Sequence, residues 1–117
     1  ANAYMHRGDA EGSMRDYDAA IEDFTATIKD DKGSVYSFYF RGALYGKKGM
    51  HGKAIADMDE AIKINPGNIW FFFSRGGAKF DNGDYQGAIG DWEKARELGF
   101  DEASVNVRIK EAKAKMK

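Results

Sequence analysis

The chain has 117 residues, of which 43% are hydrophobic and 32% are charged, and its formal net charge is −1. This length suits one compact domain or a short repeat array, and the near-neutral charge argues against a nucleic-acid-binding protein, which would carry a broad excess of Lys and Arg. No stretch approaches the roughly 18 apolar residues of a membrane-spanning helix, and without cysteine the chain can form neither a disulfide nor a thiolate metal site.

The same residues return every 34 positions along the chain. The dipeptide Arg-Gly stands at residues 7–8, 41–42 and 75–76, and Ala-Ile stands at residues 20–21, 54–55 and 88–89, with no insertion between the copies. A fixed period of this length is the sequence signature of a repeat architecture. We therefore expect three units, residues 1–34, 35–68 and 69–102, followed by a segment of residues 103–117.

Each unit contains two segments in which apolar or small residues are spaced three and four positions apart. In the second segment of each unit, this apolar stripe consists of Tyr17, Ile21, Phe24 and Ile28; of Ile55, Met58 and Ile62; and of Tyr85, Ile89 and Trp92. Such spacing puts one apolar face on a helix, so we expect two helices of about 14 residues in each unit.

The turns between the two helices of a unit carry start and stop signals. In the third unit, Gly83 can take a positive φ and end one helix, and Asp84 can cap the next. We expect Asp16 to cap the second helix of the first unit in the same way. The second unit has Met50 at this position, so its second helix begins without a cap, and Pro66 ends that unit.

The last segment, residues 103–117, has a different pattern. Val105, Ile109, Ala112 and Met116 form one apolar stripe, while Lys and Arg cover most of the other faces. A repeat array must cover the apolar face of its last unit, so we expect an amphipathic capping helix here. A basic tail that meets an acidic partner or a membrane surface is the alternative.

One cation and one anion recur in every unit. Arg stands at residues 7, 41 and 75, and Asp stands at residues 23, 57 and 91. We expect ion pairs that join the two helices of a unit or adjacent units. The alternative is that both groups are solvated, in which case each pair contributes only about 0–1 kcal/mol to stability.

The pattern of large and small residues resembles the tetratricopeptide repeat. The matching positions in the second and third units are Phe38, Gly42, Ala54, Met58 and Pro66, and Phe72, Gly76, Ala88 and Trp92. The first unit matches at Tyr4, Gly8, Ala20 and Phe24 but departs at Thr27 and Lys32. The resemblance implies an all-α fold, a right-handed α-solenoid of three helix-turn-helix units with a capping helix, in a single domain of residues 1–117.

In this family the first helices of the units line a concave groove that binds an extended or helical peptide. The corresponding residues here are Asn2, Met5, His6, Asp9, Tyr36, Tyr39, Phe40, Lys47, Trp70, Phe73, Phe80 and Asp81. We expect the aromatic rings to bury an apolar segment of a protein or peptide partner and the polar groups to orient it. Gly12, Gly46 and Gly77 would leave room between these residues. No role can be assigned to Phe71.

Two other uses of the groove stay open at this point. The rings could pack between neighbouring first helices, or the chain could be a scaffold that forms homo-oligomers through the groove or its terminal faces. Members that hold the acidic C-terminus of a chaperone use Lys, Asn and Arg in the groove. This chain has Met5, Asp9, Phe40, Trp70 and Ser74 at those positions, which speaks against that class of partner.

No catalytic group is evident in the sequence. His6 and His51 lie in different units without a nucleophile or third group, and Asp57 and Asp59 lack the i, i+4 spacing of a helical metal site. We expect His51 to be solvated. We also expect that the protein is not an enzyme, needs no cofactor or metal, and lies in the cytoplasm, although the sequence does not determine the compartment.

Overall fold

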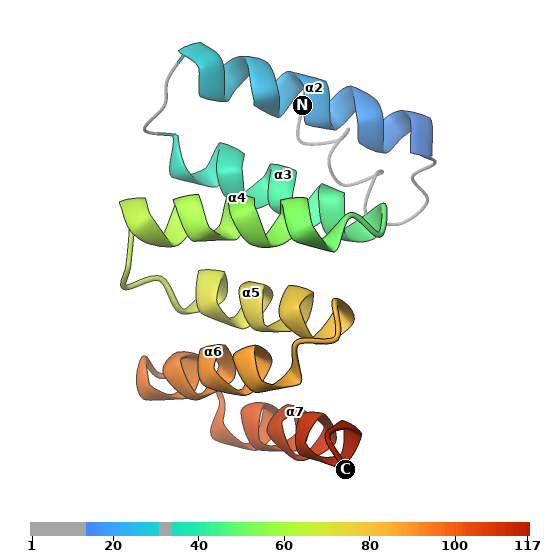
Figure 1. The fold of residues 1–117 in the computed structure, drawn as a ribbon. Helices are drawn as coiled ribbons and strands as arrows, with labels where there is room; N and C mark the ends of the chain where they lie inside the picture. The colour runs from blue at the N-terminus through green and yellow to red at the C-terminus, as the bar shows by residue number, and fades with distance from the viewer. Residues whose placement is uncertain (1–13, 31–33) are drawn as a thin grey trace.

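The computed structural model describes residues 14–30 and 34–117, and these residues form only helices, with no strand among them. The helices are α2 (Met14–Asp30), α3 (Val35–Lys47), α4 (His51–Ile64), α5 (Ile69–Asp81), α6 (Tyr85–Glu97) and α7 (Glu102–Lys115). They stack in chain order (Figure 1), and each packs on the next one along the chain. The predicted all-α solenoid is therefore confirmed, while the division at residues 34, 68 and 102 stays our proposal.

The turns follow the predicted chemistry in the second and third units. Gly83, at φ +86°, ends α5, and Asp84 caps α6 by accepting a hydrogen bond from the Gly87 amide at 2.9 Å. Helix α4 begins after Met50 without a side-chain cap, as predicted. The prediction for Asp16 was wrong, because α2 already includes Asp16 in its first turn. Arg15 stands where the third unit has the glycine that ends the preceding helix.

Small residues let the two helices of a unit cross closely. A Cβ atom built on Gly76 of α5 would lie 2.6 Å from the indole nitrogen of Trp92 on α6, and one on Gly42 would lie 3.0 Å from the Cβ of Asp57 on α4. Ala54 and Ala88, the small residues on the second helices, are 1% and 0% exposed. These contacts leave no space for larger side chains, so the recurring Gly and Ala set the distance between α3 and α4 and between α5 and α6.

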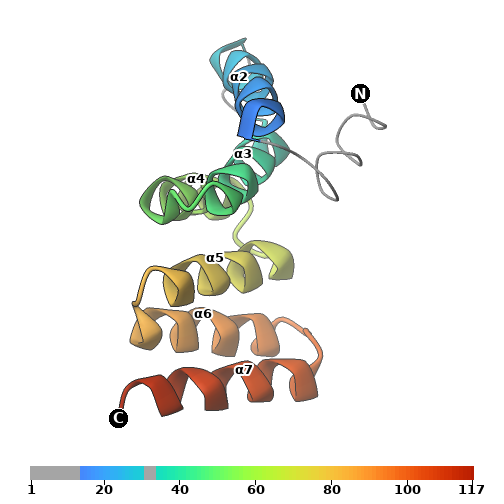
Figure 2. The same cartoon turned by 90° about the vertical axis from the view of Figure 1, so that its right-hand side faces the viewer.

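Helix α7 closes the C-terminal end of the stack (Figure 2). Val105, Ile109 and Ala112 are buried and share one hydrophobic cluster with Ile89 and Trp92 of α6. The rest of this helix is exposed to solvent. Three members of the apolar stripe predicted for this segment therefore pack on the third unit, as in a capping helix, whereas the fourth, Met116, is 50% exposed.

Candidate interaction surface

Two large aromatic rings are exposed at the same position in successive first helices. Tyr36 in the first turn of α3 is 55% exposed, and Trp70 in the first turn of α5, 34 residues later, is 54% exposed. Phe40, one turn after Tyr36, is 38% exposed. We call Tyr36, Tyr39, Phe40, Trp70 and Phe73 the aromatic surface. All five residues are among the predicted groove residues.

Phe71 anchors the α3 half of this surface from beneath. It is 1% exposed, and its ring centroid lies 6.1 Å from that of Tyr36 and 5.0 Å from that of Tyr39. The hydroxyl groups of Tyr39 and Ser74 are hydrogen bonded at 3.2 Å. Phe71 therefore fills the contact between α3 and α5, a role that its spacing in the sequence did not reveal.

The α5 half is supported by residues from beyond the third unit's two helices. Phe73 stacks on Phe100, in the loop between α6 and α7, with ring centroids 4.3 Å apart and 8° between the planes. Trp70 meets Phe100 edge to face at 5.0 Å, and the guanidinium of Arg108 lies 4.9 Å from the centre of the Phe73 ring. These contacts hold Phe73 and one edge of Trp70, while about half of the Trp70 surface stays open to solvent.

A hollow of about 330 Å³, which we call the central hollow, lies toward the C-terminal ends of α3 and α5. It is lined by Gly42, Ala43, Gly46, Lys47, His51, Ala54, Met58, Ser74, Gly77, Ala78 and Asp81. Helical glycines without Cβ atoms leave this space open, as expected for Gly46 and Gly77. His51 is only partly exposed, and its Nδ1 atom is buried without a hydrogen-bond partner, so the expectation that His51 is solvated was wrong.

The remaining predicted groove residues lie elsewhere. Phe80 packs against Tyr85 and Trp92, with ring centroids 5.2 Å and 5.8 Å away, so its ring contributes to the contact between α5 and α6. Asn2, Met5, His6 and Asp9 lie outside the residues that the structure describes. The structure thus brings together the aromatic residues of the second and third units at one end and Lys47 and Asp81 at the other.

The predicted ion pairs fix the helices that carry this surface. Arg75 donates to both carboxylate oxygens of Asp91, at 2.8 Å and 2.7 Å, and also to Asp59 of the preceding unit at 2.8 Å. Arg41 makes the same bidentate contact with Asp57. The prediction is confirmed for these two units, and Arg7 lies outside the described residues.

The carboxylates of the Arg41–Asp57 and Arg75–Asp91 pairs are buried, so these pairs stabilise the fold. Asp57 and Asp91 are only 4% and 5% exposed, and a buried carboxylate needs a charged, hydrogen-bonded partner. The hydrogen bonds to Asp91 are the largest influence that raises the pKa of Arg75 above its ordinary value, and burial acts in the opposite direction. Arg75 contacts both α4 and α6, so one guanidinium links the third unit to the second.

We also searched the described residues for a metal site and for a membrane-spanning helix. Among them, no cluster of His, Asp and Glu has the arrangement needed to hold a metal ion. None of the described helices is long and apolar enough to cross a membrane.

Stacked helix pairs with Gly and Ala at each crossing define an α-solenoid repeat protein. Residues 5–69 match the family described as tetratricopeptide repeat, so the chain belongs to the tetratricopeptide repeat family. No curated protein sequence matches the chain at a significant level.

Solved structures of similar fold cover nearly the whole chain. MamA is 23% identical over 98% of this chain, with a TM-score of 0.81, and the match spans 63% of the MamA chain. The first repeat domain of Spaghetti (RPAP3), bound to the HSP90 peptide SRMEEVD, is 19% identical over 97% of this chain and 90% of its own, with a TM-score of 0.82. The Yersinia enterocolitica type III secretion chaperone SycD, in complex with a peptide of the translocator YopD, is 17% identical over 99% of this chain and 94% of its own, with a TM-score of 0.80.

Proposed function

We propose that the protein is an interaction module that binds an apolar, aromatic-containing peptide segment of a partner protein on the aromatic surface. The observation that carries this proposal is the exposure of Tyr36 and Trp70, each more than half accessible at the same position in adjacent units. Large exposed rings held on a rigid support are typical of recognition surfaces, because their burial releases much apolar area at a small cost in side-chain entropy.

The support beneath these rings also favours binding. Phe71 and Phe100 pack against four of the rings and so support the aromatic surface from within the fold. A preformed surface loses less conformational entropy on association than a mobile one. The similar solenoids of RPAP3 and SycD are found with bound peptides. These structures support peptide binding as the function that we propose for this surface.

The partner segment that we propose is apolar. The HSP90 peptide bound by RPAP3 contains two Glu and one Asp, and carboxylates need cationic or amide groups to receive them. At the positions that would hold them, this chain has Phe40, Trp70 and Ser74 in the described units. Rings at these positions favour apolar side chains over carboxylates.

Polar groups would set the direction of the bound segment. Lys47 and Asp81 both line the central hollow, at the C-terminal ends of α3 and α5, so they could distinguish the two ends of a peptide by charge. His51 also lines this hollow. Asn2, Met5, His6 and Asp9 complete the proposed site in the first unit, and Phe80 supports it through packing.

A peptide-display selection followed by affinity measurement tests this proposal. We expect the chain to select peptides rich in aromatic and large aliphatic residues. The double variant Tyr36→Ala/Trp70→Ala should weaken their binding by at least about tenfold, as expected for two central aromatic contacts. Since both rings are more than half exposed, the variant should fold normally. The matched control Ile64→Ala/Met116→Ala removes two exposed apolar side chains elsewhere and should change affinity by less than about twofold.

Intrinsic fluorescence gives a second readout. Trp70 is exposed whereas Trp92 is 2% exposed, so ligand burial of Trp70 should shift the emission to shorter wavelength, and Trp70→Phe should abolish the shift. Peptide binding that is unchanged in the double variant would reject the surface. Concentration-dependent light scattering that is lost in the double variant would instead show a self-associating scaffold.

A further inference from the structure

The 34-residue register of the units continues into α7. Val105 stands 34 positions after Phe71, and both are buried in the first turn of their helices, at 0% and 1% exposure. Helix α7 also packs on α6, as α5 packs on α4. By position, α7 is therefore equivalent to the first helix of a further unit.

The face of α7 that would receive a second helix is altered. On α5, Arg75 and Gly76 face α6, through the ion pair with Asp91 and the close approach to Trp92. Their equivalents on α7 are Ile109 and Lys110. Lys110 cannot permit the close crossing that Gly76 permits, so a helix on this face must lie farther from α7 than α6 lies from α5.

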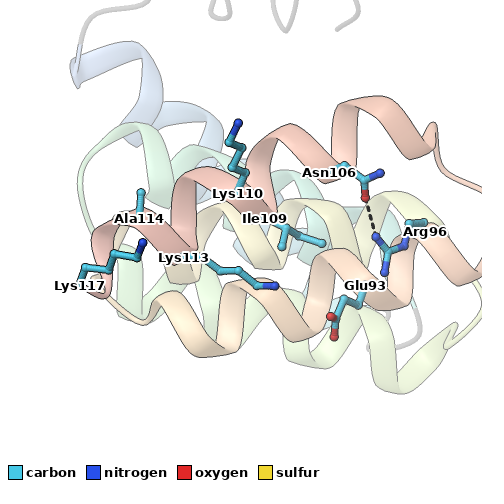
Figure 3. Close-up of a pocket in the computed structure, with 8 residues that line it drawn as sticks. All are labelled: Glu93, Arg96, Asn106, Ile109, Lys110, Lys113, Ala114 and Lys117. Carbon is cyan, nitrogen blue, oxygen red and sulfur yellow. Dashed lines mark hydrogen bonds between the residues drawn. The ribbon is translucent and has the colours of Figure 1, made fainter.

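A hollow of about 490 Å³ occupies this face, between α6 and α7, and we call it the C-terminal hollow (Figure 3). It is lined by Glu93, Arg96, Asn106, Ile109, Lys110, Lys113, Ala114 and Lys117. Figure 3 shows Lys113 extending along the space between the two helices, while Lys110 extends from the edge of α7 that lies away from α6. Exposed Ala114 and the small accessible edge of Ile109, which is 7% exposed, supply apolar surface between the charged groups.

The lining is strongly cationic for a protein of net charge −1. It contains four cations, at residues 96, 110, 113 and 117, and one anion, Glu93. Within the described part of the chain, none of these cations forms an ion pair with a carboxylate, and Arg96 donates to the neutral side-chain oxygen of Asn106 at 2.5 Å. Uncompensated charge of one sign around a hollow favours a partner of the opposite charge.

We propose that the C-terminal hollow binds an acidic amphipathic helix from a partner protein. The helix occupies the position that a second helix of a further unit would take, and its carboxylates pair with Arg96, Lys113 and Lys117. Its small apolar residues contact Ile109 and Ala114. Lysine side chains bridge the extra distance that the loss of the Gly76 equivalent imposes. This site is separate from the aromatic surface and does not depend on it.

A designed peptide provides the probe. It is an Ala-rich helix with Glu along one face, and its companion has Gln at the same positions. Fluorescence anisotropy with the full chain should show binding of the Glu peptide and none of the Gln peptide, with an affinity that falls as salt rises. Failure of the Glu peptide to bind would overturn the proposal.

Two pairs of variants distinguish binding at a defined site from nonspecific electrostatic attraction. Lys113→Glu should weaken binding by about tenfold, and Lys115→Glu, which makes the same charge change on the same helix outside the hollow, should weaken it less than about twofold. Glu93→Gln should strengthen binding by about threefold, whereas Glu97→Gln should leave it nearly unchanged. Equal effects within each pair would overturn the proposal. If the protein dimerises without the peptide and Lys113→Glu abolishes the dimer, the hollow binds a second copy of this chain and the proposal is overturned.

Discussion

Substitution of Gly76 by Ala tests the packing on which the solenoid rests. The added Cβ would lie 2.6 Å from Nε1 and 2.7 Å from Cδ1 of Trp92, well inside van der Waals contact. Trp92 is 2% exposed, and its indole N–H donates to the carbonyl oxygen of Phe73 at 3.2 Å. The ring therefore cannot move away without disturbing its own contacts.

The neighbouring residue supplies a control. A Cβ on Gly77 would meet no atom within 4 Å, although both glycines lie inside α5. Each Gly→Ala change gains up to about 1 kcal/mol from helix propensity. At Gly76 this gain is opposed by about 1–3 kcal/mol for overpacking and about 1 kcal/mol for a weakened indole hydrogen bond.

The two variants should therefore shift stability in opposite directions. We expect Gly76→Ala to lower the free energy of unfolding by about 1–3 kcal/mol and Gly77→Ala to raise it by up to about 1 kcal/mol. Urea unfolding, followed by far-UV circular dichroism and by tryptophan fluorescence, measures both changes as shifts of the midpoint. The two probes also show whether the units unfold together.

A midpoint for Gly76→Ala equal to or above that of the wild type would refute the reasoning. It would mean that α5 and α6 can separate at no cost, so the glycine would not set their distance. Equal destabilisation by Gly77→Ala would also contradict it, because the effect would then arise from α5 itself and not from the contact with Trp92.

Two further predictions concern charged groups. Asp91→Asn leaves Arg75 without its buried carboxylate and should lower the free energy of unfolding by about 2–4 kcal/mol. Asp59→Asn changes a half-exposed side chain and should lower this free energy by no more than about 1 kcal/mol. Equal losses of stability in urea unfolding would contradict the structural role of the buried pair. Hydrogen bonds from the Ser104 hydroxyl and amide lower the pKa of Asp101 below its ordinary value of 3.8. The stabilisation from this cap of α7 is therefore fully present above pH 3.8, and it is lost as the pH falls through the lowered pKa of Asp101 in the folded protein. The Ser104 amide signal in an NMR titration should therefore change with a midpoint below 3.8, and a midpoint at or above this value would contradict the cap.

The ion pairs show why part of the structure could be predicted from the repeat. Arg and Asp recur at a fixed separation of 16 residues, and the same geometry occurs in the Arg41–Asp57 and Arg75–Asp91 pairs. A repeated polar pair must find the same partner each time or be solvated each time. The repeat left open whether the pairs join the helices of one unit or adjacent units, and Arg75 does both by contacting Asp91 and Asp59.

The errors in the sequence-based predictions concern local positions that depend on neighbours. Asp16 has the residue type of a cap, yet α2 starts before it, since cap chemistry cannot decide where a helix begins when no stop signal precedes it. His51 is polar and follows a turn, yet it is only partly exposed and its Nδ1 is buried. Neither outcome could be read from the residue and its own helix alone.

The run of Phe71, Phe72 and Phe73 separates what the sequence determined from what the tertiary structure decided. The 34-residue period determined the solenoid and placed Phe72 in the core, where it is 8% exposed. The stacking of α5 on α3 buried Phe71, and the loop between α6 and α7 placed Phe100 against Phe73. The helical period determines the direction in which a side chain points from its own axis. Only the packing of the next unit decides whether another helix, a loop or solvent lies in that direction.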